Sequence, residues 1–214
     1  MPHMSTTEEL EIIAGGGGRP PSFAGGGDDS SPSGRSGIPQ RVYITGMAIG
    51  MGAILMFFMA FASAFIVRKG VGSDWQAFPM PRILWLNTLI LLASSLTIVR
   101  ARHFFTRGDR EGFRHWWMVT TILGLLFLAG QLIAWRQMVI SGFYLATNAS
   151  GSFFYVLTAA HGLHLLGGIV ALLYVGRGKL RRLTFATATE VTSVYWHFMD
   201  GLWVFLFLLL LLGR

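Results

Sequence analysis

The chain has 214 residues, of which 53% are hydrophobic and only 13% are charged, whereas an ordinary soluble domain carries about 25% charged residues. The formal net charge is +7, but the Lys and Arg residues lie at the ends of apolar segments and form no basic stripe, so nucleic acid is not an expected partner. Cysteine is absent, which excludes disulfides and thiolate metal sites.

Residues 1–40 differ from the rest of the chain because they are rich in Gly, Pro and Ser. Such a segment has little to bury and would lose much backbone entropy on ordering, so we expect a disordered cytoplasmic tail. A Gly-rich phosphate loop needs a strand before it and a helix after it, and this part of the sequence predicts neither.

The remaining region, residues 41–214, contains long runs without a charged residue. These runs are 42–67, 83–99, 115–135 and 137–176, followed by the nearly apolar run 191–213. A bilayer core about 30 Å thick requires roughly 20 apolar helical residues, and a helix satisfies its own backbone in hydrocarbon. We therefore expect an all-α polytopic membrane bundle with five transmembrane helices, at about 42–67, 83–105, 115–138, 152–175 and 188–212. The first run is too long, and begins too far into the chain, for a cleaved signal peptide.

Basic residues are unevenly divided between the two ends of these expected helices. Cytoplasmic loops carry the excess of Lys and Arg, so we expect the N-terminus inside the cell and the C-terminus outside. The side that holds the tail carries Arg19, Arg35, Arg41, Arg100, Arg102, Arg107, Arg110, Arg114, Arg177, Lys179, Arg181 and Arg182, and the other side carries Arg68, Lys69, Arg82, Arg136 and Arg214.

The expected helix 152–175 carries His161 and His164. This spacing puts both imidazoles on one helix face, where two histidines are a potential metal site. A stable site usually needs three or four ligands, however, and no carboxylate lies nearby in the sequence. Glycines flank the pair, and small residues let a neighbouring helix approach closely. We therefore favour hydrogen-bonding histidines at a tight helix contact, and expect no bound metal.

The expected helix 188–212 carries Glu190, His197 and Asp200, with Glu190 and His197 on one face and Asp200 one turn beyond. Ionisable groups at membrane depth are functional candidates by default. An acid–histidine chain is suited to relaying protons, and equally to joining helices in a satisfied polar network; the cost of an unpaired buried charge favours the network. We expect this network to comprise His161, His164, Glu190, His197, Asp200 and Gln131. The first expected helix contributes nothing to it, since Ser63 is its only hydrogen-bonding side chain between Thr45 and Arg68.

Two of the helical segments resemble a known family. The run Ser152–Gly168, SFFYVLTAAHGLHLLGG, resembles the signature helix of subunit III of haem–copper oxidases, and Glu190–Trp203, EVTSVYWHFMDGLW, resembles that family's last helix. Further agreement comes from the segments 85–88, 94–95, 130–131 and 135–137. The resemblance covers residues 42 to 212, and the five helices match the short bacterial form.

The resemblance implies a subunit of a proton-pumping terminal oxidase, cytochrome c or quinol oxidase, in the bacterial plasma membrane. In that family the haems and copper belong to subunits I and II, and subunit III stabilises subunit I, holds phospholipid and supports proton uptake. The residues agree with a chain that has no catalytic centre, because the copper pair of subunit II needs cysteines and a haem–copper centre needs more intramembrane histidines. Subunit I is the main expected partner, with subunit II and further respiratory subunits.

Two other functions compete with this one. A subunit-III-like partner of a nitric oxide reductase has the same five-helix plan and differs in what co-purifies with it. A stand-alone transporter is expected to show internal repeats and broken helices around a central site, and this sequence has no such repeat.

Lipid binding leads to a further expectation. Arg177, Lys179, Arg181 and Arg182 cluster between the last two helices, where anionic headgroups attract basic side chains. With the family's habit of holding phospholipid, this predicts a lipid in a cleft between the first two and the last three helices. The family's Ser-Glu pair in the first helix is replaced by Ala53-Ile54, so any role that rests on that carboxylate is missing here.

Overall fold

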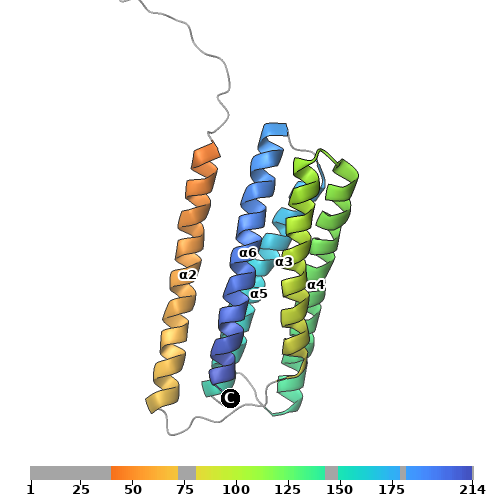
Figure 1. Ribbon diagram of the computed structural model, residues 1–214. Helices are drawn as coiled ribbons and strands as arrows, with labels where there is room; N and C mark the ends of the chain where they lie inside the picture. The colour runs from red at the N-terminus through yellow and green to blue at the C-terminus, as the bar shows by residue number, and fades with distance from the viewer. Residues whose placement is uncertain (1–39, 72–80, 143–148, 179–181, 214) are drawn as a thin grey trace, which may run out of the picture. The chain divides into compact units, whose positions relative to one another are not determined.

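The computed structural model describes residues 40–71, 81–142, 149–178 and 182–213, so the tail lies outside the described part of the chain. Within the described residues every regular element is a helix, and five helices are long and apolar enough to cross a membrane. They are α2 (Gln40–Val71), α3 (Ile83–Thr106), α4 (Arg110–Ile140), α5 (Ala149–Gly176) and α6 (Arg182–Leu212) (Figure 1). The expected all-α bundle of five membrane helices is thus confirmed.

Several helices extend beyond the apolar runs that predicted them. The largest differences are at the start of α4, at Arg110 instead of residue 115, and the start of α6, at Arg182 instead of residue 188. In α4 the reason is a capping residue: Asp109 has extended backbone angles of −79° and 101°, and its carboxylate accepts a hydrogen bond of 3.0 Å from the Gly112 amide. Such a cap satisfies an orphan donor of the first turn, so the helix begins in its polar flank.

A tight turn joins α3 to α4 and makes them an antiparallel pair. Gly108 has a φ of +77°, which is left-handed and costs least for glycine. Its amide donates to the Phe105 carbonyl at 3.0 Å, and the Asp109 amide donates to the Phe104 carbonyl at 3.1 Å. These bonds use carbonyls at the end of α3 that have no helical partner. The contact between α3 and α4 is the most extensive in the bundle.

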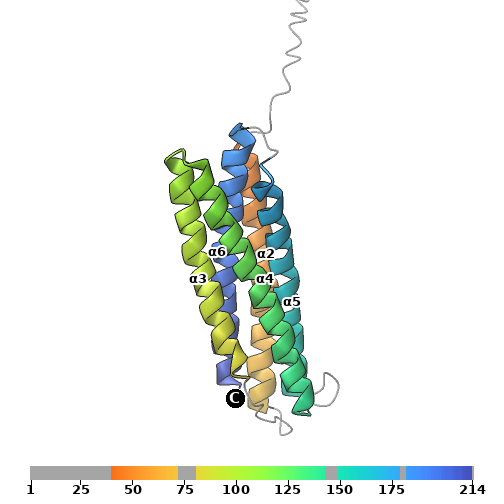
Figure 2. The same cartoon turned by 90° about the vertical axis from the view of Figure 1, so that its right-hand side faces the viewer.

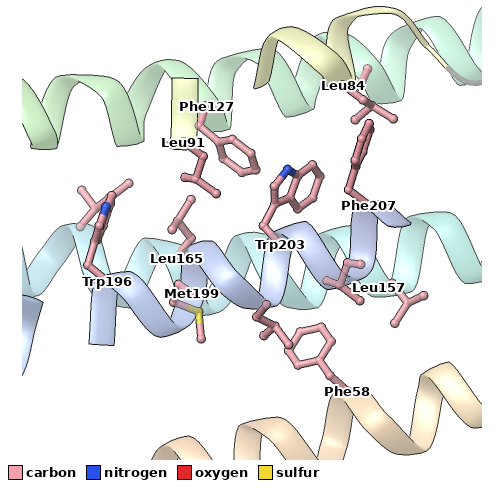
Figure 3. Packing of buried hydrophobic residues seen from close by; sticks show 14 of the residues in the cluster. Phe58, Leu84, Leu91, Phe127, Leu157, Leu165, Trp196, Met199, Trp203 and Phe207 are labelled. Carbon is pink, nitrogen blue, oxygen red and sulfur yellow. The ribbon is translucent and has the colours of Figure 1, made fainter. Parts of the chain in front are cut away.

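The core lies between α3, α4, α5 and α6, with one face of α2 against it, and combines aliphatic side chains with large aromatic rings (Figure 3). The Phe127 and Trp203 rings meet edge to face, with centroids 4.8 Å apart and planes at 87°. On the same faces of α4 and α6, the Trp196 indole lies so close to Gly124 that a Cβ there would be 2.7 Å from its ring. A glycine in α4 therefore makes the space that a tryptophan of α6 fills.

Helix α2 joins the bundle by a single stripe of side chains, Phe58, Ala62 and Phe65, which are its only buried residues among those described. The Phe65 ring meets the Phe153 ring of α5 at 5.7 Å, and the Lys69 amine donates to the Leu212 carbonyl of α6. Spacings of four and three residues put this stripe on one helix face. The other described side chains of α2 are half-buried or exposed.

The grouping of the helices differs from the expected one. α2 contacts α5 and α6, whereas α3 packs against α4 and α6, and no contact joins α2 to α3 in the described residues (Figures 1 and 2). The expectation of a cleft between the first two helices and the last three is therefore wrong. The reason is the α3–α4 turn, which ties α3 to its successor.

Candidate functional site

His161 and His164 lie three residues apart on α5, and their rings meet different helices. The His161 ring is fully buried, 5.9 Å from Phe127 of α4 and 5.1 Å from Trp203 of α6. The His164 ring lies instead 5.9 Å from Phe58 of α2. The described residues contain no group of three or more His, Asp or Glu side chains placed to hold a metal ion.

The hydrogen bonds of these two histidines also differ. His164 Nδ1 is bonded to the Ala160 carbonyl one turn earlier at 2.7 Å, and the Tyr195 hydroxyl of α6 donates to the His164 carbonyl at 2.9 Å. Neither ring nitrogen of His161 has a hydrogen-bond partner among the described residues. His164 thus helps to join α5 to α6, whereas His161 acts as an aromatic ring in the core.

Gln131, the candidate from α4, is also buried, and the described residues offer no hydrogen bond to either end of its amide. The preceding residue, Gly130, faces α3, where a Cβ would collide with the Asn87 side-chain oxygen. Asn87 is fully buried as well. The amide of Asn87 therefore occupies the space above a glycine and brings polar atoms into the α3–α4 contact.

The candidates on α6 make a contact that the sequence did not predict. His197 Nδ1 lies 2.7 Å from the Ser95 hydroxyl of α3 and is hydrogen-bonded to it. Ser95 also lies beside the carboxyl of Asp200, although neither Asp200 oxygen forms a hydrogen bond with the described residues. Glu190 is half-buried two turns earlier on α6 and does have an interaction partner. His197 thus joins two helices through its hydrogen bond to α3.

In the described part of the chain, several hydrogen bonds between helices are made by residues outside the predicted polar network. The Trp196 indole donates to Ser94 at 3.0 Å, and the Trp203 indole donates to Thr88 at 3.1 Å, which ties α6 to α3. A third indole, of Trp117 in α4, donates to the Leu172 carbonyl of α5 at 2.8 Å. Tryptophan, serine and threonine at membrane depth were the available signal, because an indole N–H requires an acceptor when it is buried.

Two grooves lie at opposite ends of the described bundle. One, of about 370 Å³, is apolar and lies between the C-terminal ends of α2 and α6, where Phe205, Leu208 and Ile66 line it. The other, of about 480 Å³, lies where α3 meets α4 and α5 approaches α6; Arg110, Arg114 and Asp109 contribute its polar wall. Arg177 is exposed at this second end. Of the other expected lipid ligands, Lys179 and Arg181 lie outside the described residues, as does the side chain of Arg182.

Known proteins with similar sequences identify the family of this helical bundle. The family described as cytochrome c oxidase subunit III matches residues 41–212, which is the whole helical region. This chain belongs to that family. It is therefore a multi-pass membrane protein and a subunit of a terminal oxidase of the respiratory electron-transport chain.

Relatives from three bacteria agree with the family assignment. The chain is 36% identical over 170 residues to the probable cytochrome c oxidase subunit 3 of Mycobacterium tuberculosis, covering 76% of this chain and 83% of that one. The corresponding protein of Nocardia farcinica is 36% identical over 187 residues, covering 80% and 92%. Cytochrome c oxidase subunit 3 of Synechocystis is 30% identical over 176 residues, covering 78% and 74%. These similarities do not favour a nitric oxide reductase partner or a transporter.

Proposed function

We propose that this chain is a non-catalytic subunit III of a proton-pumping haem–copper oxidase in a bacterial plasma membrane, where it stabilises subunit I. The proposal is supported by the polar side chains, which bond the helices of this chain to one another: His197 is hydrogen-bonded to Ser95, and Trp203 donates to Thr88. The residues do not fit the metal centres of such an oxidase, since a paired copper site needs cysteines and the chain has none, and the described residues contain no group of three or more His, Asp or Glu side chains placed to hold a metal ion. The haems and copper then belong to partner subunits I and II.

A bundle with a large exposed apolar surface is suited to supporting subunit I. Large hydrophobic side chains are exposed on the described helices; Leu96 on α3 and Leu163 on α5 are each 69% exposed. Lipid covers such surface, and so do neighbouring subunits. The absence of a carboxylate at Ile54, which is half-buried against the core, means that support of proton uptake does not pass through α2. It acts through packing, lipid and surface charge.

The test is to remove the subunit from the purified oxidase and to record spectra and turnover together. We expect the haem and copper spectra to stay unchanged and the initial rate to be retained. Activity should then decline faster than in the intact complex, because subunit I has lost its support. Loss of a haem or copper signal on removal of this subunit alone would contradict the non-catalytic assignment.

We further propose that the N-terminus faces the cytoplasm and the C-terminus the outside, on the strength of the basic residues at one end. Because the chain has no cysteine, single cysteines placed in the tail and after Leu212 report on each side separately. An impermeant thiol reagent applied to intact cells should label the C-terminal cysteine and spare the tail. Labelling of the tail alone would mean that the orientation is the opposite one.

Bound phospholipid is the third part of the proposal, and it is supported by the basic residues that follow α5. Each basic side chain near an anionic surface contributes about 1 kcal/mol, so Arg177, Lys179, Arg181 and Arg182 together favour an anionic headgroup. Changing all four to Gln should lower the phospholipid that co-purifies with the oxidase. An unchanged lipid content, measured by mass spectrometry, would exclude these residues as the headgroup site.

A further inference from the structure

Two buried polar side chains, one on α4 and one on α5, have no hydrogen-bond partner in the described part of the chain. The Gln131 side chain of α4 is 3% exposed, and the His161 side chain of α5 is fully buried. Both ends of the Gln131 amide and both ring nitrogens of His161 are unpartnered among the described residues. Such atoms are costly in a protein core, and the hydrocarbon around a membrane bundle offers them nothing.

Both side chains lie at the same level of the contact between α4 and α5. On α4, Gln131 comes four residues after Phe127 and four before Trp135, so the three share one helix face. The Phe127 ring is 5.9 Å from the His161 ring of α5, and the Trp135 indole donates to the Thr158 hydroxyl of α5 at 3.0 Å. These two contacts bracket Gln131, so its amide lies opposite the turn of α5 between Thr158 and His161.

The polar groups on either side of this turn are already bonded to others. Thr158 accepts from the Trp135 indole and donates its only proton to the Phe154 carbonyl at 2.7 Å. The indole N–H of Trp203, whose ring lies against the imidazole, is bonded to Thr88 of α3 at 3.1 Å. These neighbours therefore have no hydrogen left to give, and the amide and the imidazole require a further polar molecule.

The packing around His161 admits only a small molecule. Gly162, the next residue, keeps this turn of α5 uncrowded, because a Cβ built there would lie 3.9 Å from the Leu128 side chain of α4, an ordinary contact. Toward the core, the Phe127 and Trp203 rings lie edge to face with centroids 4.8 Å apart (Figure 3). The imidazole is 5.9 Å from the first ring and 5.1 Å from the second, so these rings limit the size of what binds beside it.

We propose that an ordered water molecule binds between the Gln131 amide and the His161 imidazole and bridges α4 to α5. A neutral imidazole offers one N–H and one acceptor nitrogen, and an amide offers two N–H bonds and an acceptor oxygen. Water donates and accepts, so one molecule can bond to both groups. A buried water makes about three hydrogen bonds to polar groups that otherwise lack a partner. The bridge adds a hydrogen-bonded link to α4 and α5 in the interior of the bundle, and it holds whatever subunits surround the chain.

Coupling between the two side chains is measured by a double-mutant cycle in the full chain, with thermal unfolding in detergent. Gln131→Met and His161→Phe should each lower the unfolding temperature by a few degrees, because each leaves the other group with fewer bonds. The double variant should lose less than the sum of the two, since its second change removes a partner that the first has already impaired. Losses that add up would contradict a shared water.

The control is His164→Phe combined with Gln131→Met. The His164 imidazole is bonded to the Ala160 carbonyl and lies beside Phe58 of α2, so its effect should add to that of Gln131→Met. Coupling as large as that of His161 would show that the cycle reports a general loosening of α5.

A density map of the purified protein with its full chain, at a resolution that shows ordered water, tests the site without any substitution. We expect a peak at hydrogen-bond distance, about 2.7–3.2 Å, from both the Gln131 amide and a ring nitrogen of His161. A direct bond between the two side chains, or a gap between them that holds no peak, would overturn the proposal.

Discussion

Helix α4 and the first half of α2 use glycine for opposite purposes. In α4, Gly124 lies under the Trp196 ring and Gly130 under the Asn87 amide, so that each glycine admits a side chain from another helix. In α2, a Cβ added at Gly46 or Gly50 would meet nothing within 4 Å. The same residue type in two apolar helices thus marks a packed contact in one and open surface in the other.

The difference extends to polar side chains. The buried face of α4 includes Thr120, Thr121 and Gln131, whereas the buried stripe of α2 is Phe58, Ala62 and Phe65. Thr120 is bonded to Thr97 of α3 at 2.8 Å. A helix in the middle of a membrane bundle is held by close packing and hydrogen bonds, since lipid tails are as apolar as the core. A helix at its edge is held by fewer contacts, and its remaining surface is available to lipid or to other subunits.

The largest effect that tests this comparison is expected from Gly124→Leu. A side chain at this position collides with Trp196, whose indole is fixed by its bond to Ser94, and such overpacking should destabilise the chain by about 3 kcal/mol or more. The matched change Gly50→Leu on α2 enters open space and should alter stability by less than about 0.5 kcal/mol. Thermal unfolding of the two variants in detergent measures the difference. Equal losses would show that α2 is packed as tightly as α4.

A smaller effect is expected from Trp203→Phe. The change removes the indole hydrogen bond to Thr88 and part of the contact with Phe127, which together should cost about 1–3 kcal/mol. Trp85→Phe is the control, because Trp85 is 56% exposed and should tolerate the change. Denaturant unfolding followed by tryptophan fluorescence distinguishes the two. If Trp85→Phe lowered stability more than Trp203→Phe did, the packed core would have to extend to the outer face of α3.

The smallest effect is expected at the start of α4. Asp109→Ala removes the carboxylate that accepts from the Gly112 amide and should cost about 1 kcal/mol, while Asp109→Asn retains an acceptor and should cost less. Amide hydrogen exchange should show faster opening of the first turn of α4 in Asp109→Ala. Exchange as slow as in the unaltered chain would mean that packing alone holds this turn.

The sequence predicted the existence of the helices better than their ends. A long apolar run is a local property, and it identifies a membrane span without knowledge of the neighbours. The ends depend on turn and cap chemistry, which hydropathy does not detect: Asp109 caps α4, which therefore starts at Arg110 instead of the predicted residue 115. The signal was in the sequence, since Asp followed by a helix-forming run is a capping pattern.

The sequence identified the polar candidates by residue type, but it did not identify their hydrogen-bond partners. His161, His164, Gln131, His197 and Asp200 all lie at positions within the bundle, and in the described part of the chain the bonds join His197 to Ser95 and the tryptophans to Ser94 and Thr88. Spacing along a helix tells which residues share a face. It does not tell which helix that face meets.

The sequence by itself determined that this protein lies in the membrane, how many times it crosses and, through two helical signatures, which family it belongs to. Charge and hydropathy suffice for the membrane spans because the bilayer acts on each segment separately. Only the tertiary structure decided that α3 pairs with α4 while α2 stands at the edge, and that His197 bonds across to α3. These choices depend on which surfaces fit closely, and a fit such as Trp196 over Gly124 is a property of two helices together.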